Sequence, residues 1–147
     1  MGTARGSRRA ARELALRALF QADIRGISAQ ETIELSFSQV HHAPPTLSFA
    51  EQLIRGALLH QPHIDRLIER YARGWTLERM ANVDRNILRL ATFELLFLPD
   101  TPPSVVVDEA VELAKKYSTQ ESGRFVNGIL GNLIRNLHQE RAELTGS

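Results

Sequence analysis

Apolar residues recur along this chain at intervals of three and four, and this period constrains the fold more than any other feature of the sequence. Such spacing places the apolar side chains on one face of an α-helix, whereas a half-buried strand needs alternating apolar and polar residues. No segment alternates convincingly, and short connections separate the periodic segments. We therefore expect an all-α protein whose helices pack as a bundle.

Turn and capping signals divide this pattern into seven expected helices. Capping boxes begin at Ser28 and Ser48, Gly26 ends the first helix, and prolines interrupt the chain within 41–45 and 99–103. The stretch 73–81 is less regular, and the residues from 138 onward read as a fraying polar tail. The expected helices run from Ser7 to about Arg25, Ser28 to Val40, Ser48 to about Leu58, Pro62 to Tyr71, Asn82 to about Leu95, Pro103 to about Lys116, and Thr119 to Leu137.

The length and composition fit one compact domain over residues 1–147, with 1–6 and 138–147 expected to be flexible. The chain has no cysteine, which excludes disulfides, a thiol nucleophile and thiolate metal sites. No apolar run is long enough for a membrane span, and the arginine-rich start leads directly into a helical pattern rather than a signal peptide. A cytoplasmic protein without membrane contact is expected.

The charge of this chain is concentrated at one end. Residues 1–17 hold five arginines and one acid, Glu13, which gives a formal +4, although the whole chain carries only +1. A terminal basic block is the usual electrostatic footprint of a phosphate-binding surface. The alternative is a solvated, partly disordered tail.

The sequence lacks the motifs that catalysis would need. There is no glycine-rich phosphate loop and no nucleophile–base pattern, so neither an enzyme nor a cofactor is expected. His60 and His63 have a spacing that a metal could use, but Pro62 lies between them and no third ligand suggests itself, so surface or capping histidines are favoured. The acids at 108–112 share their face with lysines and read as a solvated helix surface. A binding protein is the favoured class.

The first helix carries a second stripe, roughly opposite its apolar one. This stripe runs from arginines into an aromatic residue and contains Arg5, Arg9, Arg12, Leu16 and Phe20. That order suits a polyanion with stackable bases, or an electrostatic contact beside a protein anchor. Alternatively, Leu16 and Phe20 pack on a neighbouring helix while the arginines are solvated.

The last helix begins with an unusual combination of residues. Phe125 lies at the rim of the apolar stripe beside Arg124, and Gly128 and Gly131 share a face of low bulk with that arginine. A glycine costs about 1 kcal/mol relative to alanine inside a helix. Close approach of another backbone is one explanation of the glycines, and neutral drift is the other.

Four segments together resemble the bacterial NusB family of transcription antitermination factors. They occur in the family's order and spacing at 8–20 (RRAARELALRALF), 83–91 (VDRNILRLA), 107–117 (VDEAVELAKKY) and 124–130 (RFVNGIL). The resemblance extends from about Ser7 to Leu137, and residues 27–60 match only loosely. It implies an all-helical fold of two small bundles that form one compact domain.

The resemblance also implies a function. NusB-like proteins pair with NusE, a ribosomal protein of the small subunit, and bind the boxA element of nascent ribosomal RNA leaders. With other Nus factors they modify RNA polymerase, which then reads through terminators. Arginines would supply salt-dependent attraction, and NusE and RNA would raise each other's affinity if each pre-forms surface for the other.

Site residues follow from the resemblance by position. It implies that the start of the first helix contacts RNA phosphates, that the start of the last helix lies beside RNA, and that two further positions face NusE. Many family members have tyrosine where this chain has Phe20, so a hydrogen bond from that hydroxyl is missing here. The positions are Arg5, Arg8, Arg9 and Arg12 for the first helix, Glu121, Arg124 and Phe125 for the last, and Phe20 and Asp84 for NusE.

Two other functions stay open at this stage. The first is a stand-alone relative of the NusB-like domains that accompany ribosomal RNA cytosine methyltransferases, since the sequence ends at Ser147 without a cofactor-binding half. The second is an all-α interaction protein that does not bind RNA. The sequence also leaves open whether the chain is a monomer or a homodimer.

Overall fold

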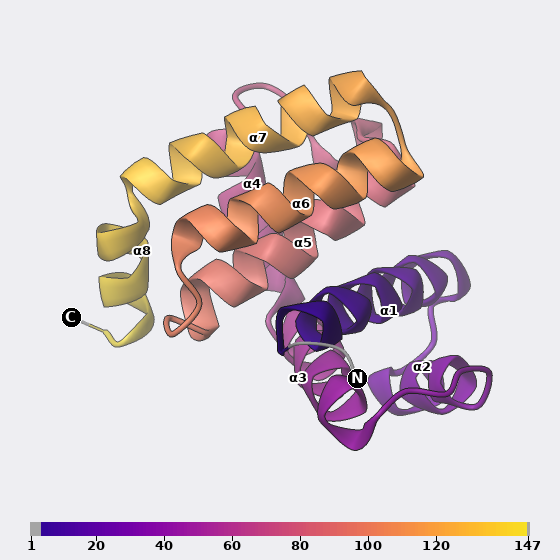
Figure 1. The fold of residues 1–147 in the computed structure, drawn as a ribbon. Helices are drawn as coiled ribbons and strands as arrows, with labels where there is room; N and C mark the ends of the chain where they lie inside the picture. The colour runs from indigo at the N-terminus through magenta and orange to yellow at the C-terminus, as the bar shows by residue number, and fades with distance from the viewer. Residues whose placement is uncertain (1–3, 147) are drawn as a thin grey trace. The chain divides into compact units, whose positions relative to one another are not determined.

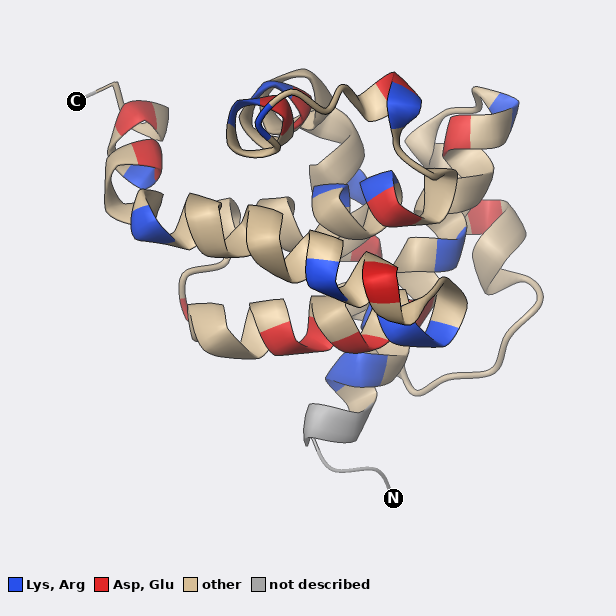
Figure 2. Ribbon diagram, turned by 90° about the horizontal axis from the view of Figure 1, so that it is seen from above, with Lys and Arg blue, Asp and Glu red and all other residues tan. Residues whose placement is uncertain are grey.

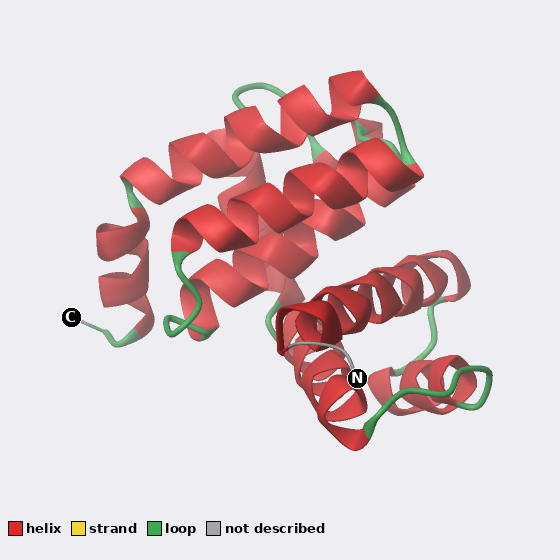
Figure 3. Ribbon diagram, in the orientation of Figure 1, coloured by secondary structure: helices red, strands yellow, loops and turns green. Residues whose placement is uncertain are grey.

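A computed structural model describes residues 4–146 of the chain, with side chains from residue 7 onward. Every regular element in this part is helical, which confirms the expected all-α class (Figure 3). The chain divides into two compact units, Met1–Leu59 and His60–Ser147. None of the described helices combines the length and hydropathy needed to cross a membrane.

The first unit contains α1 (Ala4–Arg25), α2 (Ala29–Phe37) and α3 (Pro44–Leu59) (Figure 1). Gly26, with φ +66°, ends α1, and its N–H donates to the carbonyl of Ala22. The Ser28 hydroxyl caps α2 by accepting from the N–H of Glu31 at 3.1 Å, so both expected boundaries are confirmed. The core of the unit combines alanines and leucines of α1 with apolar residues of α3: Ala11, Leu14, Ala15, Ala18, Leu19, Phe49, Leu53, Ile54 and Ala57.

The expected start of the third helix was wrong. α3 begins at Pro44 rather than at Ser48, which is exposed one turn inside the helix. Proline suits a first turn because the N–H groups there have no partner within the helix and φ is already helical. The carbonyl of Ala43 accepts from the N–H groups of Thr46 and Leu47, so both prolines lie in the opening turn.

The second unit is built around α5 (Asn82–Phe97), which is buried along most of its length. α6 (Pro103–Tyr117) and α7 (Gln120–Arg135) lie side by side against it (Figure 1). α4 (Gln61–Tyr71) also packs on α5, and a single 3₁₀ turn, η1 (Leu77–Arg79), joins the two. Pro62 and Pro103 lie in the first turns of α4 and α6, as expected.

The polar residues after 138 continue in a helix, whereas the sequence reads them as an irregular tail. A separate helix, α8 (Leu137–Leu144), follows α7, and Asn136 breaks the continuous helix by donating from Nδ2 to the carbonyl of Asn132 at 3.0 Å. The Glu140 carboxylate accepts two hydrogen bonds from Arg70 Nη1, at 2.8 and 3.1 Å. Arg141 donates twice to the carbonyl of Leu95. These bonds fix α8 to α4 and α5.

One face of α6 was also read incorrectly. Glu109, expected in water with its neighbours, is buried with 4 % exposed, whereas Asp108 and Glu112 are exposed. Glu112 pairs with Lys115 at 3.8 Å. A helical position at the border of an apolar stripe is buried or exposed according to its neighbouring helices, which the period alone does not reveal.

Candidate nucleic-acid interface

Arg8 and Arg9 are exposed in the opening turns of α1, where the sequence predicts a cationic surface (Figure 2). The guanidinium carbon of Arg8 lies 4.1 Å from the centroid of the Phe49 ring of α3. This cation–π contact holds the side chain against an aromatic face while leaving it open to solvent. Arg5 lies in α1, but its side chain is outside the described residues.

Arg12 differs from the two arginines before it, because it is buried with 4 % exposed. Its guanidinium carbon lies 5.7 Å from the Phe49 centroid, on the same ring that Arg8 contacts. The placement does not fit the direct phosphate contact expected for Arg12. Helical spacing sets the direction of a side chain but not the depth of its surroundings. Arg12 is better described as a packing residue that supports this end of α1.

The C-terminal part of the second stripe of α1, Leu16 and Phe20, is largely shielded from solvent. Leu16 is buried with 4 % exposed, and Phe20 is half-buried. This favours packing for Leu16, and it leaves part of the Phe20 ring accessible. The expected contact of Phe20 with NusE stays a prediction.

A second group of predicted residues lies at the start of α7. Glu121 and Arg124 are exposed, and Phe125 is half-buried. The Thr119 hydroxyl caps α7 by accepting from the Ser122 N–H at 3.0 Å. The exposed side chains therefore project from a helix whose first turn is well fixed.

Asp84 anchors that turn from α5. Its Oδ2 accepts from the Ser122 hydroxyl at 3.1 Å, and only 7 % of Asp84 is exposed. Its other oxygen, Oδ1, is buried without a hydrogen-bond partner among the described residues. The position was expected to face NusE, but the structure places the side chain inside the unit, where it positions α7.

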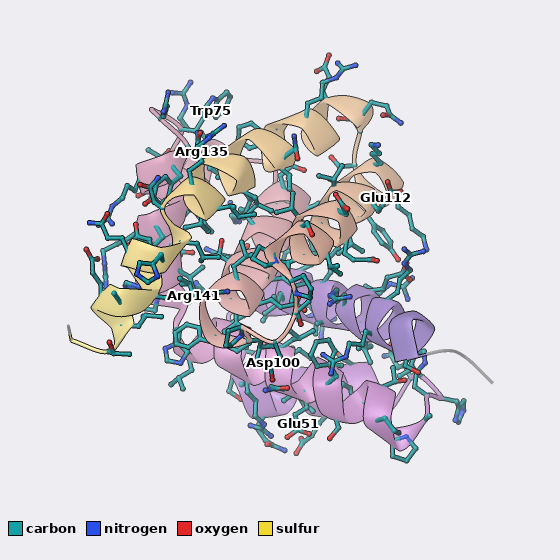
Figure 4. All side chains as sticks on the ribbon, turned by 60° about the vertical axis from the view of Figure 1, so that its left-hand side comes forward. Glu51, Trp75, Asp100, Glu112, Arg135 and Arg141 are labelled. Atoms are coloured by element: carbon teal, nitrogen blue, oxygen red, sulfur yellow. The ribbon has the colours of Figure 1, made fainter. Side chains whose placement is uncertain are left out.

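The sequence analysis missed Trp75, which is exposed at 45 % (Figure 4). Its ring meets Phe125 edge to face, with centroids 5.5 Å apart and planes at 74°. Arg79 of η1 lies with its guanidinium carbon 5.5 Å from the Trp75 ring. The available signal was the single tryptophan of the chain, placed after a glycine in an irregular stretch between arginines.

The glycines of α7 have different surroundings. A Cβ added to Gly128 or Gly131 would meet nothing within 4 Å, so no described backbone approaches them closely. At Gly123 an added Cβ would lie 3.1 Å from Lys115 Cγ of α6. Close approach of another backbone, one of the two explanations considered for Gly128 and Gly131, is not seen there among the described residues, and the neighbours of Gly123 are side chains of α6.

The two histidines considered as metal ligands lie at and just before the start of α4, and His63 Nε2 is buried without a hydrogen-bond partner among the described residues. His60 stacks on Phe97 with centroids 4.1 Å apart, and His63 is half-buried at the start of α4. Within residues 4–146, no cluster of three or more histidine, aspartate or glutamate side chains has the arrangement of a metal site.

Comparison with known proteins agrees with this arrangement. The model of the NusB family matches residues 9–135. The transcription antitermination protein NusB of Symbiobacterium thermophilum is 52 % identical over 139 residues, which cover 89 % of this chain and 91 % of that protein. This relative is named as a transcription antitermination protein.

Solved structures that resemble this chain also contain NusB proteins. NusB of T. maritima is 39 % identical with a TM-score of 0.83, over 97 % of this chain and 99 % of that chain. A structure of the antitermination factors NusB and NusE in complex with double-stranded RNA matches at 31 % identity and a TM-score of 0.81, over 90 % of this chain and 98 % of that one. Because the family model covers most of the chain and the helical arrangement agrees as well, this protein belongs to the NusB family.

Proposed function

We propose that this protein is a transcription antitermination factor that binds boxA-type RNA of ribosomal RNA leaders together with NusE. The observation that carries the proposal is the cationic opening of α1, where Arg8 and Arg9 are exposed while the apolar stripe of the same helix is buried. Exposed guanidinium groups attract phosphates and bind them through bidentate hydrogen bonds. The relative solved with NusE and RNA supports both partners.

The start of α7 supplies the second proposed RNA surface. Arg124 offers a further cation, and Phe125 offers part of an aromatic ring beside it. Glu121 accepts hydrogen bonds, so it suits the amino groups of bases rather than phosphates. Cationic side chains contribute affinity that does not depend on the RNA sequence, whereas contacts with base edges and stacking on bases give sequence specificity.

NusE is the proposed protein partner, with Phe20 as its contact on α1. A half-buried aromatic ring suits a protein anchor, since it offers apolar area from a fixed side chain. Asp84 is proposed to act on this function indirectly, by holding α7 in place. RNA polymerase and the other Nus factors would join through the assembled complex, in the cytoplasm where transcripts are made.

Titration of the full chain with a labelled single-stranded boxA RNA tests the proposal. Fluorescence anisotropy is measured with and without NusE, against a scrambled strand of equal length and against a duplex of the boxA sequence. We expect boxA to bind more tightly than the scrambled strand, and NusE to increase that preference. Equal affinities for the three RNAs in the presence of NusE would overturn the boxA assignment, and absence of binding at low salt would overturn RNA binding altogether.

A further inference from the structure

Trp75 is unusual in the second unit because a large apolar ring is left 45 % exposed. It follows α4 in a short connection, where Arg73 and Gly74 both have positive φ, at 46° and 95°. Two successive residues with positive φ turn the chain sharply, and this conformation is unfavourable for Arg73, which is not a glycine. The turn brings Trp75 to the edge of the unit rather than into its core (Figure 4).

The exposed ring is nevertheless held in place. Phe125 of α7 contacts it in a T-shaped arrangement, and the Arg79 guanidinium lies over it at 5.5 Å. The chain just after Trp75 is also fixed, because the N–H of Leu77 donates to Glu69 at 3.0 Å. An ordered aromatic surface loses little conformational entropy when a ligand stacks on it.

The charges near the ring favour an anionic ligand. Arg73, Arg79 and Arg124 are exposed residues in or beside the two segments that hold the aromatic pair. The exposed acids around the ring are Glu69, Glu78 and Glu121. Arg85 also lies at this connection, where its Nη1 donates to the Leu77 carbonyl at 3.3 Å, so four cations stand against three acids. A purely apolar protein anchor has no need of this excess, whereas a polynucleotide offers a flat base and a phosphate together.

We infer that Trp75, supported by Phe125 and Arg79, is a stacking site for an unpaired base of single-stranded RNA. The inference rests on the proposed function and extends its second surface from α7 to the connection after α4. A base can stack on an aromatic ring only if it is not already paired and stacked within an RNA duplex. Single strands therefore bind here and duplexes do not. Arg73 and Arg79 attract the phosphates that flank the stacked base.

The single tryptophan makes the contact directly observable, since all indole fluorescence of the chain comes from Trp75. The full chain is titrated with single-stranded boxA RNA, with the same strand carrying abasic sites, and with a blunt duplex of equal length. Binding of each RNA is followed in parallel by anisotropy of a label on the RNA. We expect saturable quenching with the intact strand only, at the concentrations where anisotropy reports binding.

Variants then test whether stacking contributes to affinity. Trp75→Ala is expected to weaken binding of the single strand by about fivefold or more, and Trp75→Phe to keep most of the affinity. Leu59→Ala is the matched control, because Leu59 is an exposed apolar residue, at 75 %, that belongs to the first unit. Circular dichroism and thermal melting establish that each variant is folded.

The outcomes separate this inference from the function on which it rests. If no RNA binds the wild-type chain at low salt, the proposed function fails. If RNA binds the wild-type chain without changing its fluorescence, and Trp75→Ala binds RNA as tightly as the wild type does, only the stacking site is wrong. Loss of NusE binding by Trp75→Ala with unchanged RNA affinity would instead assign the ring to a protein contact, and it would equally overturn the inference.

Discussion

The Ser122 hydroxyl donates a 3.1 Å hydrogen bond to Asp84 Oδ2, which ties the first turn of α7 to the first turn of α5. The same hydroxyl lies 2.8 Å from that of Ser118, so the contact belongs to a small polar network. Asp84 also places a negative charge in the opening turn of α5, where the helix dipole favours it. This network determines where Arg124 and Phe125 project.

Replacing Asp84 is therefore expected to destabilise the fold. Asp84→Ala removes the hydrogen bond from the buried Ser122 hydroxyl and the favourable charge in the first turn of α5, which together cost about 1–3 kcal/mol in the free energy of unfolding. Asp84→Lys is expected to cost more, because it adds a buried cation at a helix N-terminus. Urea denaturation monitored by circular dichroism measures both values.

The sequence places Asp84 only at the surface that faces NusE, whereas its burial predicts that a substitution also lowers stability. Ser122→Ala is the control, since it removes the same hydrogen bond without adding charge. It leaves the buried Asp84 carboxylate without the Ser122 donor, so we expect a loss of about 1–3 kcal/mol. Wild-type stability in Asp84→Lys would show that the buried contact contributes nothing.

Arg8 and Arg9 are expected to set the salt dependence of RNA binding. Each phosphate contact on a single strand contributes about 0.7 to the slope of log affinity against log salt concentration. Arg8→Ala with Arg9→Ala should therefore lower the magnitude of the slope by up to about 1.4. Anisotropy titrations from low to moderate salt give the slope.

The control for this pair is Arg66→Ala, an exposed arginine of α4 outside the residues proposed to contact RNA. Its slope should equal that of the wild type. If the double variant and Arg66→Ala have the same slope, the start of α1 does not contact phosphates.

Arg12 is expected to contribute to stability, unlike its exposed neighbour Arg9. Arg12→Ala removes a buried side chain that contacts the Phe49 ring, so a loss of about 1–3 kcal/mol is expected. Arg9→Ala should stay within about 0.5 kcal/mol of the wild type, as surface substitutions usually do. Thermal and urea unfolding of the two single variants compare them directly, and equal stabilities would contradict the assignment of Arg12 as a packing residue.

Tyr71 is expected to make the fold sensitive to high pH. Burial raises the pKa of the Tyr71 phenol above its usual value of about 10, and the Glu140 carboxylate raises it further because the phenol donates a hydrogen bond to it. A phenol with a raised pKa in the folded state stabilises that state while it is protonated. The contribution is present below pH 10 and is lost as the pH rises through the folded-state pKa.

Urea midpoints measured between pH 8 and 11 test this expectation. The wild type should lose stability above pH 10 more steeply than Tyr71→Phe, which cannot ionise at this position. The substitution keeps the backbone carbonyl of Tyr71 that accepts from Asn132 at 3.3 Å. Parallel pH curves would exclude Tyr71 as the source of the effect.

The helices themselves could be predicted because period, proline and glycine act locally. Gly26, Ser28, Pro62 and Pro103 mark boundaries through their own backbone geometry or hydrogen bonds, so one sequence suffices to read them. Ser48 misled because a capping box and a helix interior can share one sequence, and the prolines before it already open the helix. Whether such a serine begins a helix or lies within one depends on the conformation of the turn before it.

The candidate site was less predictable, because the depth of a side chain depends on distant elements. Arg9 and Arg12 look equivalent in sequence, yet Arg9 is exposed and Arg12 is buried. Asp84 is buried by a partner 38 positions away. Trp75 was missed because it meets Phe125 only through folding, and no local pattern links the two residues.

The attachment of α8 has a consequence for the order in which this protein is made. Arg70, Tyr71 and Leu95 find their partners Glu140 and Arg141 only after the chain has grown by a further 46 to 70 residues. During translation the second unit therefore stays incomplete until these late residues have left the ribosome. The residues of the first unit, by contrast, have all been synthesised before those of the second unit.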